Sequence, residues 1–168
     1  MILSKSELIS SLQNEVRLVV HLLGKADRSQ LDYRPSGRQR STLELARYIS
    51  MMGPEIIRYS LSETPGFEAW TKADEAAKAL DFDQAVDAIK AQHDVYADLL
   101  GGLTDETLRA EVTDFDGKKT SRGAFIVNLV LGGCAAYRMQ LFLYLKASGC
   151  PTLDSANLWS GMDSPQPT

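Results

Sequence analysis

The sequence has few of the residues that support redox, metal or polyanion chemistry. Its 168 residues include two cysteines and two histidines. The 22 acidic residues outnumber the 18 lysines and arginines, which gives a formal net charge of −4 at pH 7 and excludes a polybasic nucleic-acid or membrane-surface binder. The longest apolar stretch, residues 123–137, is interrupted by Asn128 and is shorter than the ~18 apolar residues of a membrane span. We therefore expect no nucleic-acid partner and no membrane partner.

The cysteines and the first residues favour a reducing, cytoplasmic setting. Cys134 and Cys150 are 16 positions apart along one expected helix and its exit. At 1.5 Å per residue this is ~24 Å, which is too far for a disulfide. The segment that begins at Met1 carries Glu7 and lacks the apolar run and small-residue cleavage site of a secretory signal. We expect two reduced thiols and a cytoplasmic location.

The overall composition is that of one globular domain. Hydrophobic residues make up 44% and charged residues 24%, near the globular average, and a chain of this length can bury a sizeable core. We expect one domain over residues 1–163. The last residues, 164–168, are polar and proline-containing and are expected to fray.

Capping signals mark where three long helices begin. Ser4 with Glu7 and Ser41 with Glu44 form S-x-x-E capping boxes, and the carboxylate of Asp81 can cap a third helix. Apolar residues then recur at three- and four-residue steps, the spacing of a helix with one buried face. The stretch between the second and third helices, residues 61–80, could hold a short amphipathic helix.

The second half of the chain supplies the fourth helix. Residues 121–148 contain no proline and are apolar around most of the helix circumference, which is typical of a central bundle helix, and Gly149 ends it. Before it, Asp116-Gly117 is a tight-turn pair between two short extended pieces. Four long helices and almost no strand predict an all-α four-helix bundle.

Familiar catalytic motifs are absent, so the histidines carry most of the chemical information. There is no G-x-G-x-x-G, C-x-x-C, H-E-x-x-H or G-x-S-x-G. His21 points away from the apolar stripe of its helix and is expected to be exposed. His93, between Ile89 and Tyr96, is expected near the middle of a buried stripe. It is either a hydrogen-bonded core imidazole or a general base or ligand at the floor of a pocket.

Two tyrosines extend this candidate site. Tyr48 and Tyr137 flank apolar stripes, so their rings can lie inside the bundle while each phenol needs a polar partner. Either one alone fits core packing, whereas both together with His93 form a polar cluster between helices. The small residues at 132–136 allow a close helix approach or leave a gap for a ligand.

Three segments resemble the DinB/YfiT superfamily. The run LDYRPSGRQRSTLELARYI (31–49) resembles its first loop and second helix, in which a Y/W-x-P stretch precedes an RS-x-x-E-L helix start. The run AYRMQLFLYLKASG (136–149) is similar to its helix-four pattern HHRGQL-x-x-YLR-x-x-G, and NLWSGMD (157–163) is similar to the tail of many members. The resemblance implies a DinB/YfiT-like four-helix bundle with a long crossover between helices two and three, and a short irregular or hairpin segment before helix four. It also implies an often dimeric protein with a divalent metal held by three histidines.

This sequence departs from the family pattern at the metal. The family's helix-two histidine would fall at Tyr48, and its two helix-four histidines at Gly133 and Tyr137. A protonated phenol is a poor ligand and glycine has no side chain, so we expect no metal and no cofactor. The resemblance then leaves an interhelical pocket lined by Tyr48, His93, Gly133 and Tyr137.

Three functions fit these observations. The first is a metal-free protein that binds a small, mostly apolar molecule in the interhelical pocket. The second is an enzyme, similar to the thiol-cofactor-dependent transferases or hydrolases among the relatives, that uses His93 as acid or base. The third is a structural, stress-related homodimer without a ligand. Loss of all three metal ligands counts against the ancestral chemistry, so binding is the prediction. A homodimer is expected in any case, because helix four is apolar over more of its circumference than one bundle seam requires.

Overall fold

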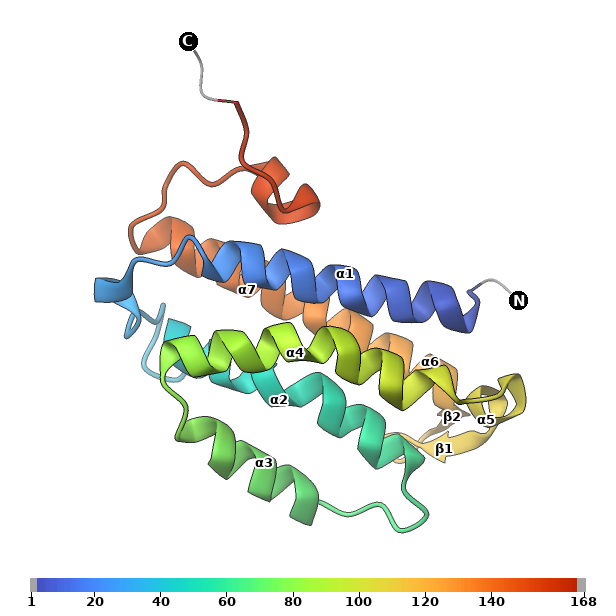
Figure 1. Ribbon diagram of the computed structural model, residues 1–168. Helices are drawn as coiled ribbons and strands as arrows, with labels where there is room; N and C mark the ends of the chain where they lie inside the picture. The colour runs from blue at the N-terminus through green and yellow to red at the C-terminus, as the bar shows by residue number, and fades with distance from the viewer. Residues whose placement is uncertain (1–2, 166–168) are drawn as a thin grey trace.

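The computed structural model describes residues 3–165, and it is an all-α bundle as the sequence predicts (Figure 1). Four long helices run side by side: α1 (Lys5–Leu23), α2 (Thr42–Leu61), α4 (Phe82–Gly101), and a fourth composed of α6 (Arg122–Ile126), the π-helical segment η2 (Val127–Leu131) and α7 (Gly132–Ala147). The buried apolar faces of these helices form one core. A helix with one apolar stripe must cover it with another element, and the bundle does this for all four.

Local capping fixes three of the helix starts. The Ser4 hydroxyl accepts from the Glu7 amide at 3.3 Å, and the Ser41 hydroxyl accepts from the Glu44 amide at 3.2 Å. Both capping boxes are complete, because each glutamate side chain bonds back to the serine amide. Asp81 caps α4 in the same way. Each cap satisfies amide donors that the first helical turn leaves without partners, so these predicted starts are confirmed.

The crossover between α2 and α4 holds α3 (Glu68–Lys78), which packs against α2. After α4, the short helix α5 (Asp105–Arg109) leads to an antiparallel hairpin of β1 (Glu111–Thr113) and β2 (Lys119–Ser121), with Val112 opposite Thr120. Gly117 has a φ of 84° in the turn, a conformation that glycine adopts without steric cost. The long crossover and the hairpin segment before the fourth helix are both confirmed.

The fourth helix spans residues 122–147, close to the predicted 121–148. Because α6, η2 and α7 are continuous, residues 122–147 are long and apolar enough to cross a membrane when judged by length and composition alone, a test that the core helix of a bundle also passes. Here this helix packs against α1 and α2. It also carries the buried Arg138, whose guanidinium forms two hydrogen bonds with Glu15 of α1, at 2.8 and 3.2 Å.

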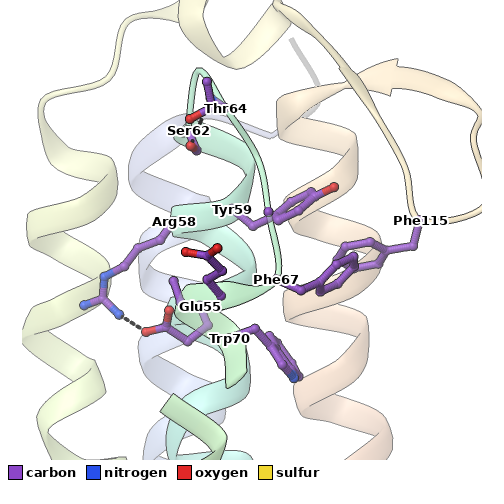
Figure 2. Close-up of a pocket in the computed structure, with 11 residues that line it drawn as sticks. Glu55, Arg58, Tyr59, Ser62, Thr64, Phe67, Trp70 and Phe115 are labelled. Atoms are coloured by element: carbon purple, nitrogen blue, oxygen red, sulfur yellow. Dashed lines mark hydrogen bonds and ion pairs between the residues drawn. The ribbon is translucent and has the colours of Figure 1, made fainter. Parts of the chain in front are cut away.

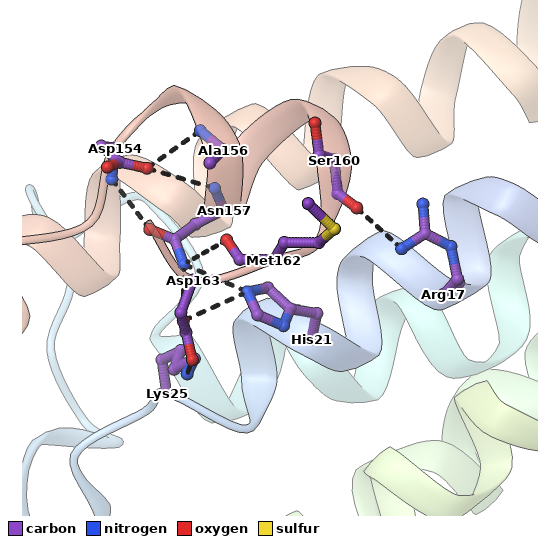
Figure 3. Close-up of polar contacts among 9 residues, drawn as sticks. All are labelled: Arg17, His21, Lys25, Asp154, Ala156, Asn157, Ser160, Met162 and Asp163. Carbon is purple, nitrogen blue, oxygen red and sulfur yellow. Dashed lines mark hydrogen bonds and ion pairs between the residues drawn. The ribbon is translucent and has the colours of Figure 1, made fainter. Parts of the chain in front are cut away.

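The C-terminal segment folds back over α1 (Figure 3). It contains the turn η3 (Ala156–Ser160), and the amide of Asn157 donates to Asp163 at 2.9 Å and lies 3.2 Å from His21 Nε2. The side chain of His21 is therefore only 18% exposed, which corrects the expectation that it faces solvent. The periodicity of α1 could not reveal this cover, because it comes from 136 positions away in the chain. Residues 166–168 of the expected frayed tail lie outside the described residues.

Candidate functional site

A cavity of about 490 Å³ opens between α2, the start of α3 and the fourth helix. This is above the ~300 Å³ at which small-molecule pockets begin. We call it the tyrosine cavity; its lining residues are Tyr48, Met52, Ile56, Phe67, Trp70, Phe115, Asn128, Leu129, Gly132, Gly133, Ala136 and Tyr137. The structure therefore brings together three of the four residues that the sequence predicted for a pocket.

Gly133 keeps the floor of the tyrosine cavity open. A Cβ at this position would lie 3.3 Å from the terminal methyl group of Met52. That is a tight contact, and any longer side chain would extend into the space that the glycine leaves. Because Gly133 has no side chain, a gap remains at this level between α7 and the side chains of α2.

Tyr48 and Tyr137 form the polar element of the cavity. Their rings meet edge to face, with centroids 5.1 Å apart and an interplanar angle of 70°. Burial raises the pKa of Tyr48, and a hydrogen bond with Tyr137 raises that pKa further. Both effects favour the protonated phenol, because desolvation disfavours the charged form. The Tyr48 phenol is therefore a neutral hydrogen-bonding group near pH 7.

His93 is not in the cavity, which corrects its predicted position. Its side chain is 56% exposed, and its Nδ1 lies 2.9 Å from the carboxylate of the neighbouring Asp94. The interior position on α4 belongs to Gln92, which donates to the Ile49 carbonyl at 2.8 Å and accepts from the Tyr96 hydroxyl at 3.1 Å. Gln92 and His93 flank the same apolar stripe, but only the Gln92 side is covered by α2. His93 therefore does not line this cavity.

The cavity does not fit the metal centre that the family resemblance implies. Within residues 3–165, no three His, Cys, Asp or Glu side chains are grouped so that they could hold a metal ion. At the expected ligand positions the chain offers Gly133 and two phenols, of which Tyr48 is held in its protonated form. The nearby Cys134 is buried, and burial raises the pKa of its thiol to about 12, so the thiol is protonated near pH 7.

Exposed aromatic rings continue the cavity towards the hairpin (Figure 2). Phe67 and Phe115 are 60% and 47% exposed, and each packs against Tyr59 of α2, with ring centroids 5.8 and 5.1 Å apart. With Trp70, they separate the tyrosine cavity from a second cavity of about 720 Å³, which also contains the Glu55–Arg58 ion pair. We call this second space the aromatic cavity. Because Phe67, Trp70 and Phe115 line both spaces, the two cavities are neighbours along α2.

This aromatic wall, formed by Phe67, Trp70 and Phe115, is hard to predict from the sequence. Phe67 ends the loop after α2, and Phe115 lies in the hairpin turn, so neither falls on a helical stripe. Large apolar side chains in turn segments are the one available signal, because such segments are usually polar. Only the fold shows that both rings meet at the same place.

Comparisons with known proteins identify the fold. No protein-family model matches the chain, and no curated protein matches it. Among solved structures, a DinB-like protein of Bacillus subtilis, YjoA, is similar with a TM-score of 0.65 and 17% sequence identity, over 85% of this chain and 92% of that one. At this identity the likeness establishes the fold. The chain has a DinB-like all-α fold, which confirms the sequence resemblance at that level.

Proposed function

We propose that this protein binds a small, largely apolar molecule in the tyrosine cavity without the help of a metal. The observation that carries the proposal is the cavity itself, which is open above Gly133 and lined mainly by aromatic and aliphatic side chains. Pockets of this size with a few polar groups are the usual form of small-molecule sites. Aromatic walls suit flat or chain-like apolar groups, because they offer large contact areas.

The tyrosine pair would give the ligand its orientation. Each phenol carries one O–H donor, so a hydrogen bond between the two would use one O–H and leave the other available. A ligand with a single acceptor atom could receive this second hydrogen bond from Tyr48 or Tyr137. A fully apolar ligand would leave it unmade, at a cost of about 1 kcal/mol or more.

Binding is favoured over acid–base catalysis by the identity of the lining residues. The tyrosine cavity is lined by tyrosines, one asparagine and apolar residues, with no His, Cys, Asp, Glu or Lys among them. General acid–base catalysis works best with a group whose pKa is near the operating pH. The Tyr48 pKa is moved in the opposite direction, above its ordinary value.

The chain contains a natural reporter for this proposal. Of its two tryptophans, Trp70 lines the cavity and Trp159 lies in the C-terminal turn, 64% exposed. In a Trp159→Phe background, phenylnaphthylamine, a neutral apolar fluorophore, is expected to quench Trp70 saturably and to gain fluorescence itself. Gly133→Leu places a branched side chain in the cavity and is expected to abolish both signals.

Ala147→Leu is the control, because it places the same leucine side chain at an exposed position of the same helix. Saturable quenching that Gly133→Leu removes and Ala147→Leu keeps supports the site. Equal probe binding in the two variants, with both folded by circular dichroism, contradicts it.

We further propose that the chain forms a homodimer through α7. Met139 and Leu143 lie one helical turn apart on its outer face and are 38% and 56% exposed. Two large apolar side chains on one exposed face favour a partner surface, and a two-fold dimer places the same face of each copy in contact. Light scattering should give twice the chain mass for the wild type and a single mass for Leu143→Glu. A monomeric wild type overturns this proposal and leaves the binding proposal intact.

A further inference from the structure

A third cavity lies beside Tyr48. It has a volume of about 410 Å³. We call it the arginine cavity; its lining residues are Arg40, Glu44, Arg47, Tyr48, Asp74, Ala77 and Lys78. Tyr48 lines both this cavity and the tyrosine cavity, so the two cavities meet at its side chain.

Arg40 is a cation without an anionic partner at this junction. Its guanidinium carbon lies 3.8 Å from the centre of the Tyr48 ring, in cation–π contact. Among the residues that the structure describes, no carboxylate pairs with Arg40 and no side-chain or backbone acceptor bonds its guanidinium. Arg40 is exposed to solvent, so its guanidinium is held over the tyrosine with no protein acceptor on its planar set of donors.

The acidic neighbours of Arg40 are already engaged. Glu44 pairs with Arg34 at 3.2 Å, and Asp74 pairs with Lys78 at 2.5 Å. The remaining cation, Arg47, donates to the Leu80 carbonyl at 2.6 Å.

The arginine cavity and the aromatic cavity differ in charge. The arginine cavity has three cationic side chains, Arg40, Arg47 and Lys78, against two carboxylates. The aromatic cavity has two carboxylates, Glu55 and Glu68, against the single cation Arg58. An anionic group is favoured in the arginine cavity, although the whole chain carries a net charge of −4.

We propose that the ligand is an amphipathic organic anion, with an aryl or acyl group in the tyrosine cavity and a carboxylate, sulfonate or phosphate paired with Arg40. This rests on the proposed function, since it needs the apolar part to occupy the tyrosine cavity. A guanidinium presents two parallel N–H donors that match the oxygens of such an anion. The Tyr48 ring beneath it fixes the orientation of the guanidinium, which lowers the entropy lost on binding.

Two probes separate the anionic and apolar contributions. Anilinonaphthalene sulfonate and phenylnaphthylamine share the same aromatic framework, and only the first carries an anion. Arg40→Gln is expected to weaken binding of the sulfonate about threefold or more, as for a partly exposed ion pair, and to leave the neutral probe unchanged. Arg40→Lys, which keeps the charge, is expected to retain more of the sulfonate affinity than Arg40→Gln.

Arg38→Gln is the control, because it removes the same charge from the same loop at a residue outside the cavity lining. If Arg40→Gln and Arg38→Gln change sulfonate binding equally, or if Arg40→Gln weakens both probes to the same extent, the anion site is refuted while the binding proposal stands. If neither probe responds to Gly133→Leu, the tyrosine cavity is not the binding site, and both proposals fail.

Discussion

Gly53 of α2 lies against the fully buried ring of Tyr96 from α4, and replacing it should expose how tightly the two helices pack. A Cβ on Gly53 would be 2.0 Å from the Tyr96 hydroxyl oxygen and 3.1 Å from the ring carbon that carries it. Gly53→Ala must displace the hydroxyl from its 3.1 Å hydrogen bond to Gln92. Overpacking costs up to ~3 kcal/mol and the hydrogen bond ~1 kcal/mol, whereas alanine gains ~1 kcal/mol in a helix. We expect a net loss of about 2–3 kcal/mol in the free energy of unfolding.

A double-mutant cycle tests whether the clash with the Tyr96 hydroxyl is the reason that Gly53→Ala destabilises the protein. In Tyr96→Phe the clashing oxygen is gone, so Gly53→Ala should cost less than ~1 kcal/mol in that background. Urea unfolding of the four proteins, followed by circular dichroism, gives the coupling between the two positions, expected at about 2 kcal/mol. If Gly53→Ala costs the same in both backgrounds to within ~0.5 kcal/mol, the contact is not the reason for the glycine.

Three further outcomes follow from other parts of the structure. Glu15→Gln leaves the buried Arg138 guanidinium without its anionic partner and should lower stability by about 3 kcal/mol in urea unfolding, whereas a loss under ~1 kcal/mol would show that the pair is not buried as described. Burial and then the Lys25 charge lower the pKa of His21, with Asp163 opposing. The unfolded chain therefore binds more protons than the folded chain just below the ordinary histidine pKa of ~6.5, so stability should fall as pH drops through this window. His21→Gln should flatten the pH dependence of stability in this window. An unchanged pH dependence would show that other groups cause it. Elemental analysis after dialysis should find no stoichiometric transition metal, and one metal per chain would show that the ligand set has been misread.

The parts of the fold that the sequence could predict are those fixed by local interactions. The capping boxes at Ser4 and Ser41 and the turn at Gly117 depend on residues within a few positions of one another, and all three are present. The stop at Gly149 is of the same kind, since its φ of 128° lies where other residues are strained.

The parts that could not be predicted depend on which side of a helix is covered. Gln92 and His93 flank one stripe, and periodicity gives their angles around the helix but not what packs against each. Covering by α2 buries the polar Gln92 and leaves His93 in solvent. One cavity is lined by Tyr48, Gly133 and Tyr137. Their grouping could be predicted because the resemblance implies how the helices are arranged around one another, which the periodicity of each helix does not.

Methionine methyl NMR tests the central claim, ligand binding in the tyrosine cavity, most directly. The chain has five methionines, of which Met52 lines the cavity while Met139 and Met162 are exposed elsewhere. On titration with phenylnaphthylamine, the account predicts a saturable shift of the Met52 methyl signal, because an aromatic ligand would lie against it, with Met139 and Met162 unchanged. Shifts at Met139 or Met162 with Met52 unmoved would contradict it.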